Sequence, residues 1–380
     1  MIVEEFLRWV RSAPTDARID ATRALATAYL YSELDPRTRD TAEAALTTLL
    51  DDSSTGVRRM LAETLAPSPH APRHIIRELA SDQPDIAAPV LARSPVLLDA
   101  ELVDIIGLGD PRSQAVIAGR PHLPPTVAAA IIEVGSVQAC VALVENGAAR
   151  IGLSSFHRLV ERHGADPALR DLLLARRDLP LEIRQRLIAR LGEALSSFVT
   201  DRAWMPKPRA ETMARDACDK ATVTIAMDAS DREVESLVAH LRASGELTTS
   251  LILRAICLGE NRFFEAALAN LSGLPRVRVY ALLERGNDGA FRALYDKARL
   301  PSSAFPAFRA ALHLLREMRY ENETGNRYRF ASRMIERILT RADDIGDAEL
   351  DRLLAMLRRF AADAARDVAR EFAERCATAA

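Results

Sequence analysis

The residues with the clearest capacity for binding chemistry lie between positions 316 and 341. Seven arginines fall in this stretch, interleaved with Tyr320, Tyr328 and Phe330, and four glutamates leave a local charge of +3. Guanidinium groups pair with phosphates or carboxylates, and aromatic rings stack on bases or fill a pocket of a partner protein. The candidate partner-binding residues are Arg316, Arg319, Arg327, Tyr328, Arg329, Arg333 and Arg337.

This arginine–aromatic stretch allows three interpretations. A helix whose arginines pair with neighbouring glutamates and whose rings are buried would be purely structural. Exposed arginines and rings would instead anchor a protein partner, because these residue types dominate the binding energy of interfaces. The same groups would hold nucleic acid through phosphate contacts and base stacking. The sequence leaves these alternatives open.

Elsewhere the residue types that catalyse reactions or bind metals do not combine into a motif. His70 and His74 have the spacing of two ligands on one helical turn, but Pro72 lies between them and no cysteine or carboxylate cluster completes a site. The run Gly107-Leu108-Gly109 lacks the third glycine of a dinucleotide-binding loop, and the sequence contains no P-loop and no HExxH motif. We therefore predict a protein that is not an enzyme, with no catalytic residue, no metal ligand and no cofactor.

The composition indicates an all-helical protein of the cytoplasm. Hydrophobic residues make up 48% of the 380 residues but aromatic residues only 5%, and no alternating strand pattern is present. The four cysteines have neither disulfide-framework nor metal-ligand spacing. No signal peptide and no apolar run of about eighteen residues is present, so we expect no membrane span.

The charge distribution argues against nucleic acid as the partner. The net charge is −2; residues 1–200 carry 26 acidic and 22 basic side chains (−4), and residues 201–380 carry 27 and 29 (+2). A protein that binds nucleic acid along its length needs a strongly basic surface. Neither half of the chain has one.

Residues 51–195 contain a repeat that would position any binding surface. One set of apolar runs recurs at intervals of 26, 26, 26 and 31 residues, and a second set of branched pairs recurs at 30, 26, 28 and 28, with prolines between the two sets in most copies. This pattern predicts two short helices per unit, stacked into an all-α, HEAT-like α-solenoid with a period of about 26–30 residues. We expect Ile105 to lie at a stacking seam. The first set begins at Leu65, Leu91, Ile117, Leu143 and Leu174, and the second at Ile75, Ile105, Ile131, Leu159 and Leu187.

The array has a predicted cap and a predicted continuation. Residues 1–50 are expected to form N-terminal capping helices, over Ile2–Arg11, Thr15–Tyr31 and Pro36–Leu50. The pattern breaks over 196–209, our candidate domain boundary, and a second helical repeat region follows over 210–320. Four glycines recur there at intervals of 14, 14 and 13 residues, and each is expected to end a helix with a positive φ: Gly245, Gly259, Gly273 and Gly286.

The last segment, residues 321–380, is predicted to be a helical hairpin. Its final helix has an apolar stripe at spacings of three and four, from Leu350 to Phe372. As a coiled-coil seam over 347–376, the stripe would make a homodimer. Packed against Phe330, Met334 and Ile338, it would cap the solenoid instead.

Several stretches, read in order, resemble a known family. They include Leu61–Ala66, Val90–Pro95, Asn146–Ala148, Arg176–Pro180 and Phe263–Ala269. Together they resemble an uncharacterised α-proteobacterial family known as domain of unknown function 2336, over roughly residues 15–320. The resemblance implies a cytoplasmic bacterial protein without an agreed activity, and it does not include the last sixty residues.

The function that we expect is a non-enzymatic scaffold or adaptor whose solenoid binds another protein. Two alternatives remain. A nucleic-acid-binding protein of the DNA-repair type would require a basic groove. An enzyme would require a pocket with several ionisable groups that sequence does not reveal.

Overall fold

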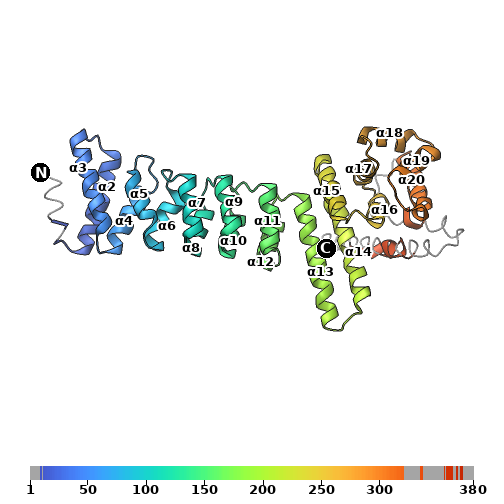
Figure 1. Cartoon of the computed structure of the whole chain (residues 1–380), viewed down its shortest axis with the longest axis horizontal. Coiled ribbons are helices and arrows are strands. Elements are labelled where there is room, and N and C mark those ends of the chain that lie inside the picture. The colour runs from blue at the N-terminus through green and yellow to red at the C-terminus, as the bar shows by residue number, and fades with distance from the viewer. Residues whose placement is uncertain are drawn as a thin grey trace, which may run out of the picture. The chain divides into compact units, whose positions relative to one another are not determined.

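The computed structural model describes residues 9, 10, 12–320, 334–336, 355, 357–362, 365, 366, 369 and 370. Over these residues the chain has 21 helices and no strand, which confirms the predicted all-α fold (Figure 1). The chain forms two compact units, unit 1 (Met1–Leu179) and unit 2 (Pro180–Ala380). Among the described helices, none combines the length and the apolar character needed to cross a membrane.

Unit 1 is a helical solenoid of two rows. In the first row, α2, α4, α6, α8, α10 and α12 pack one on the next; in the second row, α7 packs on α9 and α9 on α11. The helices of unit 1 are α2 (Thr15–Tyr31), α3 (Pro36–Thr48), η1 (Leu49–Asp51), α4 (Thr55–Leu65), α5 (Arg73–Ala80), α6 (Pro84–Arg93), α7 (Asp99–Leu108), α8 (Pro111–Ala118), α9 (Pro125–Val134), α10 (Val137–Glu145), α11 (Leu153–His163) and α12 (Pro167–Ala175).

Local sequence explains where these helices begin. Proline occupies one of the first two positions of α3, α6, α8, α9 and α12, where its missing N–H group is not needed. The side chains of Asp35, Asp110, Ser136 and Asp166 accept hydrogen bonds from first-turn N–H groups of the helices that they precede.

The repeated apolar residues form the core of unit 1, with a shift at two helices. Leu65, Leu91, Ile117 and Leu143 are all fully buried or nearly so, as predicted. In α12, however, Leu173 is buried and Leu174 only partly. In α7, Ile106 is buried, whereas Ile105 is half-buried and lines a surface groove, so the expected seam position of Ile105 is wrong. Helical periodicity fixes a face only to within about one residue, and packing decides which neighbour turns inward.

Polar side chains connect the repeats of unit 1 at helix ends. Arg120 donates to the carbonyl groups of Leu91, in the last turn of α6, and of Ser94, just after it. The Asn146 amide nitrogen donates to the Ala118 carbonyl at 2.9 Å and to the carbonyl of Arg120 itself at 2.8 Å. These bonds satisfy carbonyl groups that have no partner inside their own helix.

Arg176 continues the series one repeat further. Its guanidinium donates to the carbonyl groups of Val144 at 2.9 Å, Asn146 at 3.1 Å and Ala149 at 3.1 Å, and it pairs with Asp178 at 2.8 Å. We call Arg120, Asn146 and Arg176 the carbonyl ladder, because each joins its own repeat to the helix end of the preceding one. Cationic members also complement the negative end of the helix dipole.

Unit 2 is also built from two rows of helices. Here α13, α15, α17 and α19 pack in succession, and α16 packs on α14 and on α20. Its helices are α13 (Leu181–Asp201), α14 (Lys207–Met227), α15 (Asp231–Ser244), α16 (Thr249–Cys257), α17 (Asn261–Ser272), α18 (Arg276–Arg285), α19 (Asp288–Lys297), η2 (Ser302–Ala304) and α20 (Phe305–Tyr320).

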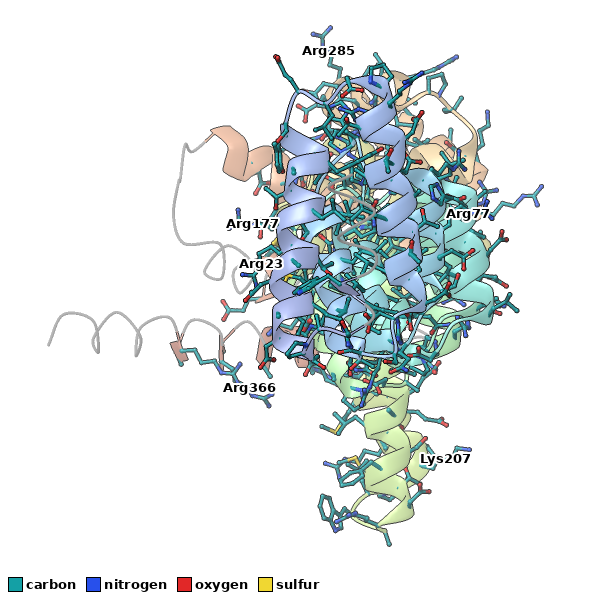
Figure 2. The ribbon with its side chains drawn as sticks, turned by 90° about the vertical axis from the view of Figure 1, so that its left-hand side faces the viewer. Arg23, Arg77, Arg177, Lys207, Arg285 and Arg366 are labelled. Carbon is teal, nitrogen blue, oxygen red and sulfur yellow. The ribbon has the colours of Figure 1, made fainter. Side chains whose placement is uncertain are left out.

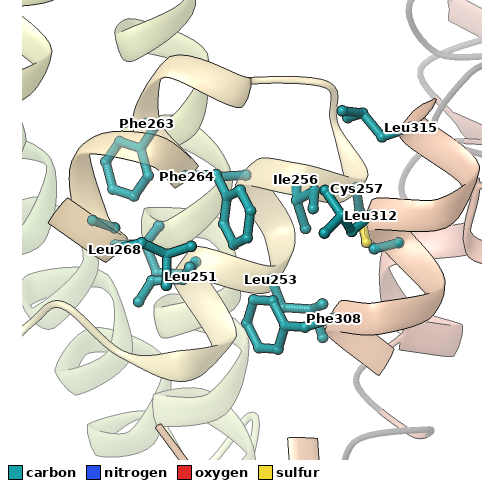
Figure 3. Packing of buried hydrophobic residues seen from close by; sticks show 14 of the residues in the cluster. Leu251, Leu253, Ile256, Cys257, Phe263, Phe264, Leu268, Phe308, Leu312 and Leu315 are labelled. Carbon is teal, nitrogen blue, oxygen red and sulfur yellow. The ribbon is translucent and has the colours of Figure 1, made fainter. Parts of the chain in front are cut away.

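The core of unit 2 surrounds α16. Every residue from Leu251 to Cys257 is buried, as expected for a helix that is enclosed on all sides (Figure 3). Phe264 of α17 and Phe308 of α20 stack on one another with ring centroids 5.9 Å apart. Leu357 and Phe360 belong to the same core.

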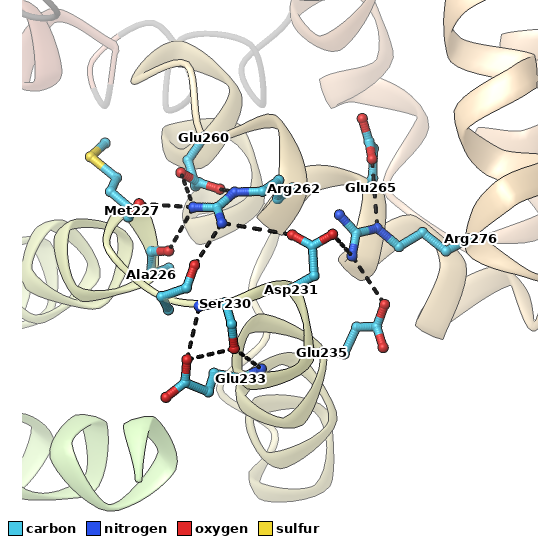
Figure 4. A network of polar contacts seen from close by, with 11 residues as sticks. Ala226, Met227, Ser230, Asp231, Glu233, Glu235, Glu260, Arg262, Glu265 and Arg276 are labelled. Atoms are coloured by element: carbon cyan, nitrogen blue, oxygen red, sulfur yellow. Dashed lines mark hydrogen bonds and ion pairs between the residues drawn. The ribbon is translucent and has the colours of Figure 1, made fainter. Parts of the chain in front are cut away.

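Arginines connect the elements of unit 2 as well. Arg262, near the start of α17, donates to the carbonyl groups of Met227, the last residue of α14, at 2.8 Å and of Ala229 at 2.6 Å (Figure 4). It also pairs with Glu260 at 3.1 Å. Arg276 pairs with Asp231 at 3.2 Å and with Glu235 at 3.0 Å. The ends of four helices are thereby held together.

Three of the four predicted helix-ending glycines have the expected backbone. Gly245, Gly259 and Gly273 have φ values of 76°, 79° and 70°. Gly286 has φ −73° and is extended, so the prediction is wrong there. Asn287 follows at once and caps α19, which needs an extended connection rather than a left-handed turn.

The break predicted over residues 196–209 has a local explanation. The division between the two units falls at Leu179 and Pro180, whereas Ser196 to Asp201 are the last turn of α13 and α14 begins at Lys207. Proline and aromatic residues interrupt the apolar pattern because the chain turns there within a helical hairpin. The predicted hairpin over 321–380 and the homodimer seam over 347–376 lie largely outside the described residues.

We expect Arg120→Met to destabilise the chain. The substitution keeps the apolar stem but leaves the Leu91 and Ser94 carbonyl groups without their donor, which should lower the free energy of unfolding by about 2–4 kcal/mol. Arg120→Lys should recover only part of this loss, because an ammonium group does not present the guanidinium fork. Urea denaturation measures the effect, with exposed Arg93→Met as the control. Equal midpoints for Arg120→Met and Arg93→Met would contradict the structural role of the ladder.

Unit 2 should also respond to pH through Asp219. Burial raises the pKa of Asp219 to about 6 from 3.8, although Arg254 and a 3.3 Å hydrogen bond from Ser250 act in the opposite direction. The folded state therefore binds this proton more tightly than the unfolded state, and this contribution to stability is lost as the pH rises through about 6.

Asp219→Asn should accordingly stabilise the protein by about 1–3 kcal/mol at pH 8, and its advantage should shrink as the pH approaches 4. Thermal melts across this range measure the effect. The exposed Asp228→Asn serves as the control, for which we expect no such trend. A destabilised Asp219→Asn variant at pH 8 would show that the ionised carboxylate is favoured in the fold.

Candidate protein-binding groove

The predicted arginine–aromatic site is described only at its beginning. The Arg316 guanidinium donates to the Leu283 carbonyl near the end of α18, with an Nε–O distance of 2.8 Å. Arg316 therefore has the same helix-end role as the carbonyl ladder. Arg319 lies in α20, and nothing is described of its side chain. The remaining predicted residues, Arg327, Tyr328, Arg329, Arg333 and Arg337, lie outside the described part of the chain.

A groove in the second row of unit 1 is the strongest alternative site. The α7–α9 pair is in close contact, whereas a cavity of about 480 Å³ lies between α9 and α11 and one of about 470 Å³, with more lining side chains, lies between α5 and α7. We call the latter the α5–α7 groove. Residues of the α5 end, of α7 and of the α8 start line it, principally Arg77, Ala80, Asp82, Leu97, Glu101, Asp104, Ile105, Leu108 and Asp110.

The groove has an apolar wall and an exposed apolar rim. Ala80 and Leu97 are buried, with 5% and 7% of their surface exposed, and Ile105 is half-buried. Leu108, the last residue of α7, is 93% exposed. Leu108 and the half-buried Ile105 both line the groove, so its exposed apolar surface is not a single isolated side chain.

Carboxylates surround this apolar wall, and most of them form ion pairs or hydrogen bonds within the chain. Asp82 receives two hydrogen bonds from Arg58, at 2.7 and 3.2 Å. Glu101 lies 3.1 Å from both Arg73 and Arg77, and Figure 2 shows Arg77 at the surface. The Glu101 pairs join α7 to α5, whereas Asp82, just after α5, is paired with Arg58 of α4.

The other two carboxylates of the groove, Asp110 and Asp104, differ in their hydrogen-bond partners. Asp110 caps α8 by accepting from the N–H groups of Arg112 and Ser113. Asp104 is exposed and, among the described residues, has no hydrogen-bond or ion-pair partner. Asp104 is thus the carboxylate of the groove that is available to a cationic group.

Three carboxyl groups of the groove are held in their ionised form. Burial raises the pKa of Asp82, Glu101 and Asp110, but hydrogen bonds outweigh it, from Arg58, from the Leu98 N–H and from Ser113 respectively, and each pKa is lowered overall. A general acid needs a pKa near neutral pH. The lowered pKa values of Asp82, Glu101 and Asp110 therefore do not suit the role of a general acid.

His74 and Cys140 have structural surroundings. His74 lies 2.9 Å from the Thr47 hydroxyl and 3.7 Å from Glu43. Burial raises the pKa of Cys140 to about 11, so its thiol is protonated at neutral pH. No group of three or more potential metal ligands occurs among the residues that the structure describes.

Sequence reasoning missed the α5–α7 groove. The run Gly107-Leu108-Gly109 is the one local signal of the groove. It places a leucine between two glycines at the end of α7, and this leucine is exposed. The groove itself depends on the separation of α5 from α7, which is a property of the stacked repeats and not of a local pattern.

Comparison with known proteins identifies a family but no characterised relative. Residues 86–347 match the model of a family described as an uncharacterised protein conserved in bacteria (DUF2336). No curated protein and no solved structure matches the chain.

Proposed function

We propose that this chain, which belongs to the DUF2336 family of uncharacterised bacterial proteins, is a non-enzymatic α-solenoid scaffold that binds another protein. The observation that carries the proposal is the α5–α7 groove, where an apolar wall, an exposed leucine and fixed carboxylates occur together. Stacked helical repeats commonly use such extended surfaces to hold a partner segment.

The groove favours a partner segment with apolar and basic side chains. Apolar groups of the segment would cover Leu108 and the wall at Ile105, and a lysine or arginine would pair with Asp104. The groove is open to solvent along its rim, so it suits a helix or an extended chain rather than an enclosed small molecule. Carboxylates repel phosphate, which favours protein over nucleic acid here.

The chemistry of the groove supports binding rather than catalysis. The pKa values of Asp82, Glu101 and Asp110 are lowered, and the Ser113 hydroxyl donates at 3.0 Å to Asp110, whose lowered pKa makes it a weak base. We place the scaffold in the cytoplasm, where Cys140, Cys218 and Cys257 would remain the free thiols that they are in the fold.

Site-specific photocrosslinking in cells tests the proposal. A benzophenone amino acid replaces Leu108 in the groove or, as the control, Leu153, which is a 45% exposed leucine on α11. We expect a discrete protein adduct from position 108 and none of the same mass from position 153. Mass spectrometry of the adduct identifies the contacting segment of the partner.

The segment identified in this way allows a quantitative second step. As a synthetic peptide it should bind the purified chain, and Asp104→Lys should weaken its affinity by about 3–30-fold, because a like charge replaces the free carboxylate. Asp171→Lys, at an exposed aspartate of α12, should leave the affinity unchanged. Identical adducts from both positions, or an affinity insensitive to Asp104→Lys, would refute the groove as the binding site.

A further inference from the structure

The hairpin of α13 and α14 carries a second exposed apolar surface. Both helices have 21 residues, and their connecting turn lies away from the other helices of unit 2 (Figures 1 and 2). The two helices approach closely at Gly192, where a Cβ atom would lie 2.5 Å from the Cys218 sulfur. Small residues at this contact make the hairpin a narrow two-helix projection.

Large apolar side chains line one face of α13 and continue into the turn. Leu191, Leu195 and Phe198 are spaced by four and three residues, which places them on one helix face, and they are 44%, 58% and 45% exposed. Trp204, in the turn, is 67% exposed. We call these four residues the hairpin-tip surface.

The exposure of Trp204 is built into an ordered turn. Ala203 has φ 54°, a left-handed conformation that a non-glycine residue seldom adopts. The backbone N–H of Ala203 donates to the Thr200 carbonyl at 2.9 Å, and the backbone N–H of Trp204 donates to the Val199 carbonyl at 3.0 Å. The Trp204 ring packs edge-on against Phe198, with centroids 5.7 Å apart. The turn thus holds two aromatic rings together at the surface.

One basic side chain packs on these rings, and two more follow them in the sequence. The Arg202 guanidinium lies over Phe198 at 4.3 Å and over Trp204 at 5.5 Å. Residues 198–209 contain Arg202, Lys207 and Arg209 against Asp201, which is three positive charges minus one negative charge, or +2. Lys207 is 3.9 Å from the exposed Glu211, a long surface pair that salt weakens.

We propose that the hairpin-tip surface docks onto an anionic lipid membrane, with Phe198 and Trp204 entering the headgroup region and Arg202, Lys207 and Arg209 facing lipid phosphates. Tryptophan is enriched at the membrane–water interface, and basic residues add attraction to anionic lipid. A protein interface of ordinary size needs roughly 800 Å² on each partner. A projecting turn with four apolar side chains suits insertion into a fluid surface better than such a flat, complementary contact.

Tryptophan fluorescence provides a direct test, because Trp9 and Trp204 are the two tryptophans of the chain. Trp9→Phe leaves Trp204 as the single reporter in the full-length protein. We expect a blue shift of its emission with vesicles of phosphatidylcholine and phosphatidylglycerol, and quenching when the lipids carry bromine in their acyl chains. Vesicles of phosphatidylcholine alone should give a much smaller shift, because they lack the anionic charge.

Co-sedimentation with the same vesicles tests the residues. Phe198→Ser combined with Trp204→Ser should reduce the bound fraction about tenfold, because both interfacial rings are lost. Lys207→Glu combined with Arg209→Glu should abolish the preference for anionic vesicles. Tyr280→Ser removes another exposed aromatic residue of unit 2, at 47% exposure on α18, and should bind like the parent chain. Circular dichroism verifies that each variant retains its helices.

Three results would overturn the proposal. The first is that Trp204 emission does not change with either vesicle. The second is that vesicle binding persists in the Phe198→Ser, Trp204→Ser variant. The third is a blue shift without vesicles that grows with protein concentration, together with a dimer in sedimentation; it would assign the surface to a second copy of the chain. None of these results affects the α5–α7 groove, because the two surfaces are built from different helices.

Discussion

The stacking of the repeats depends on satisfying the backbone carbonyl groups at the C-terminal ends of short helices. A helix of eight to ten residues, such as α6 or α8, leaves its last four carbonyl groups without partners inside the helix, which is a large share of its backbone. Arg120, Asn146 and Arg176 supply those partners from the next repeat in unit 1, and Arg262 and Arg316 do so in unit 2. Apolar contacts provide the stacking energy, whereas these bonds fix how one repeat meets the next.

Because of this constraint, several of the abundant arginines of the chain have a structural role. Arg120 and Arg176 are 9% and 8% exposed, and their donors are directed at main-chain oxygens, so they are not available to phosphates or to partners. We propose that binding occurs instead where the stacking is incomplete. In unit 1 that place is the α5–α7 groove, where Asp104 has no partner among the residues that the structure describes. In unit 2 it is the hairpin-tip surface, where α13 and α14 extend past the helices that cover their other ends.

The sequence was sufficient for the helices but not for the contacts between them. Pro36, Pro111 and Pro125 mark helix starts locally, and the recurrence of Leu65, Leu91 and Ile117 reports one buried row, so both were predictable. Whether Ile105 or Ile106 turns inward depends on the packing of α7. Gly286 does not have the expected positive φ, because Asn287 caps α19 directly after it and needs an extended connection. The groove was not predictable, because no local pattern encodes the distance between α5 and α7. The predicted site at Arg327–Arg333 stays a prediction.

Hydrogen–deuterium exchange of Arg176→Met tests the role of the ladder most directly, with Arg177→Met, its exposed neighbour, as the matched control. Arg176 binds the carbonyl groups of Val144, Asn146 and Ala149, whereas Arg177 lies on the surface. If the carbonyl ladder fixes the stacking of one repeat on the next, backbone amides of α10, of residues 146–149 and of α12 exchange much faster in Arg176→Met than in Arg177→Met. Equal exchange in the two variants would show that apolar packing alone holds the repeats in place.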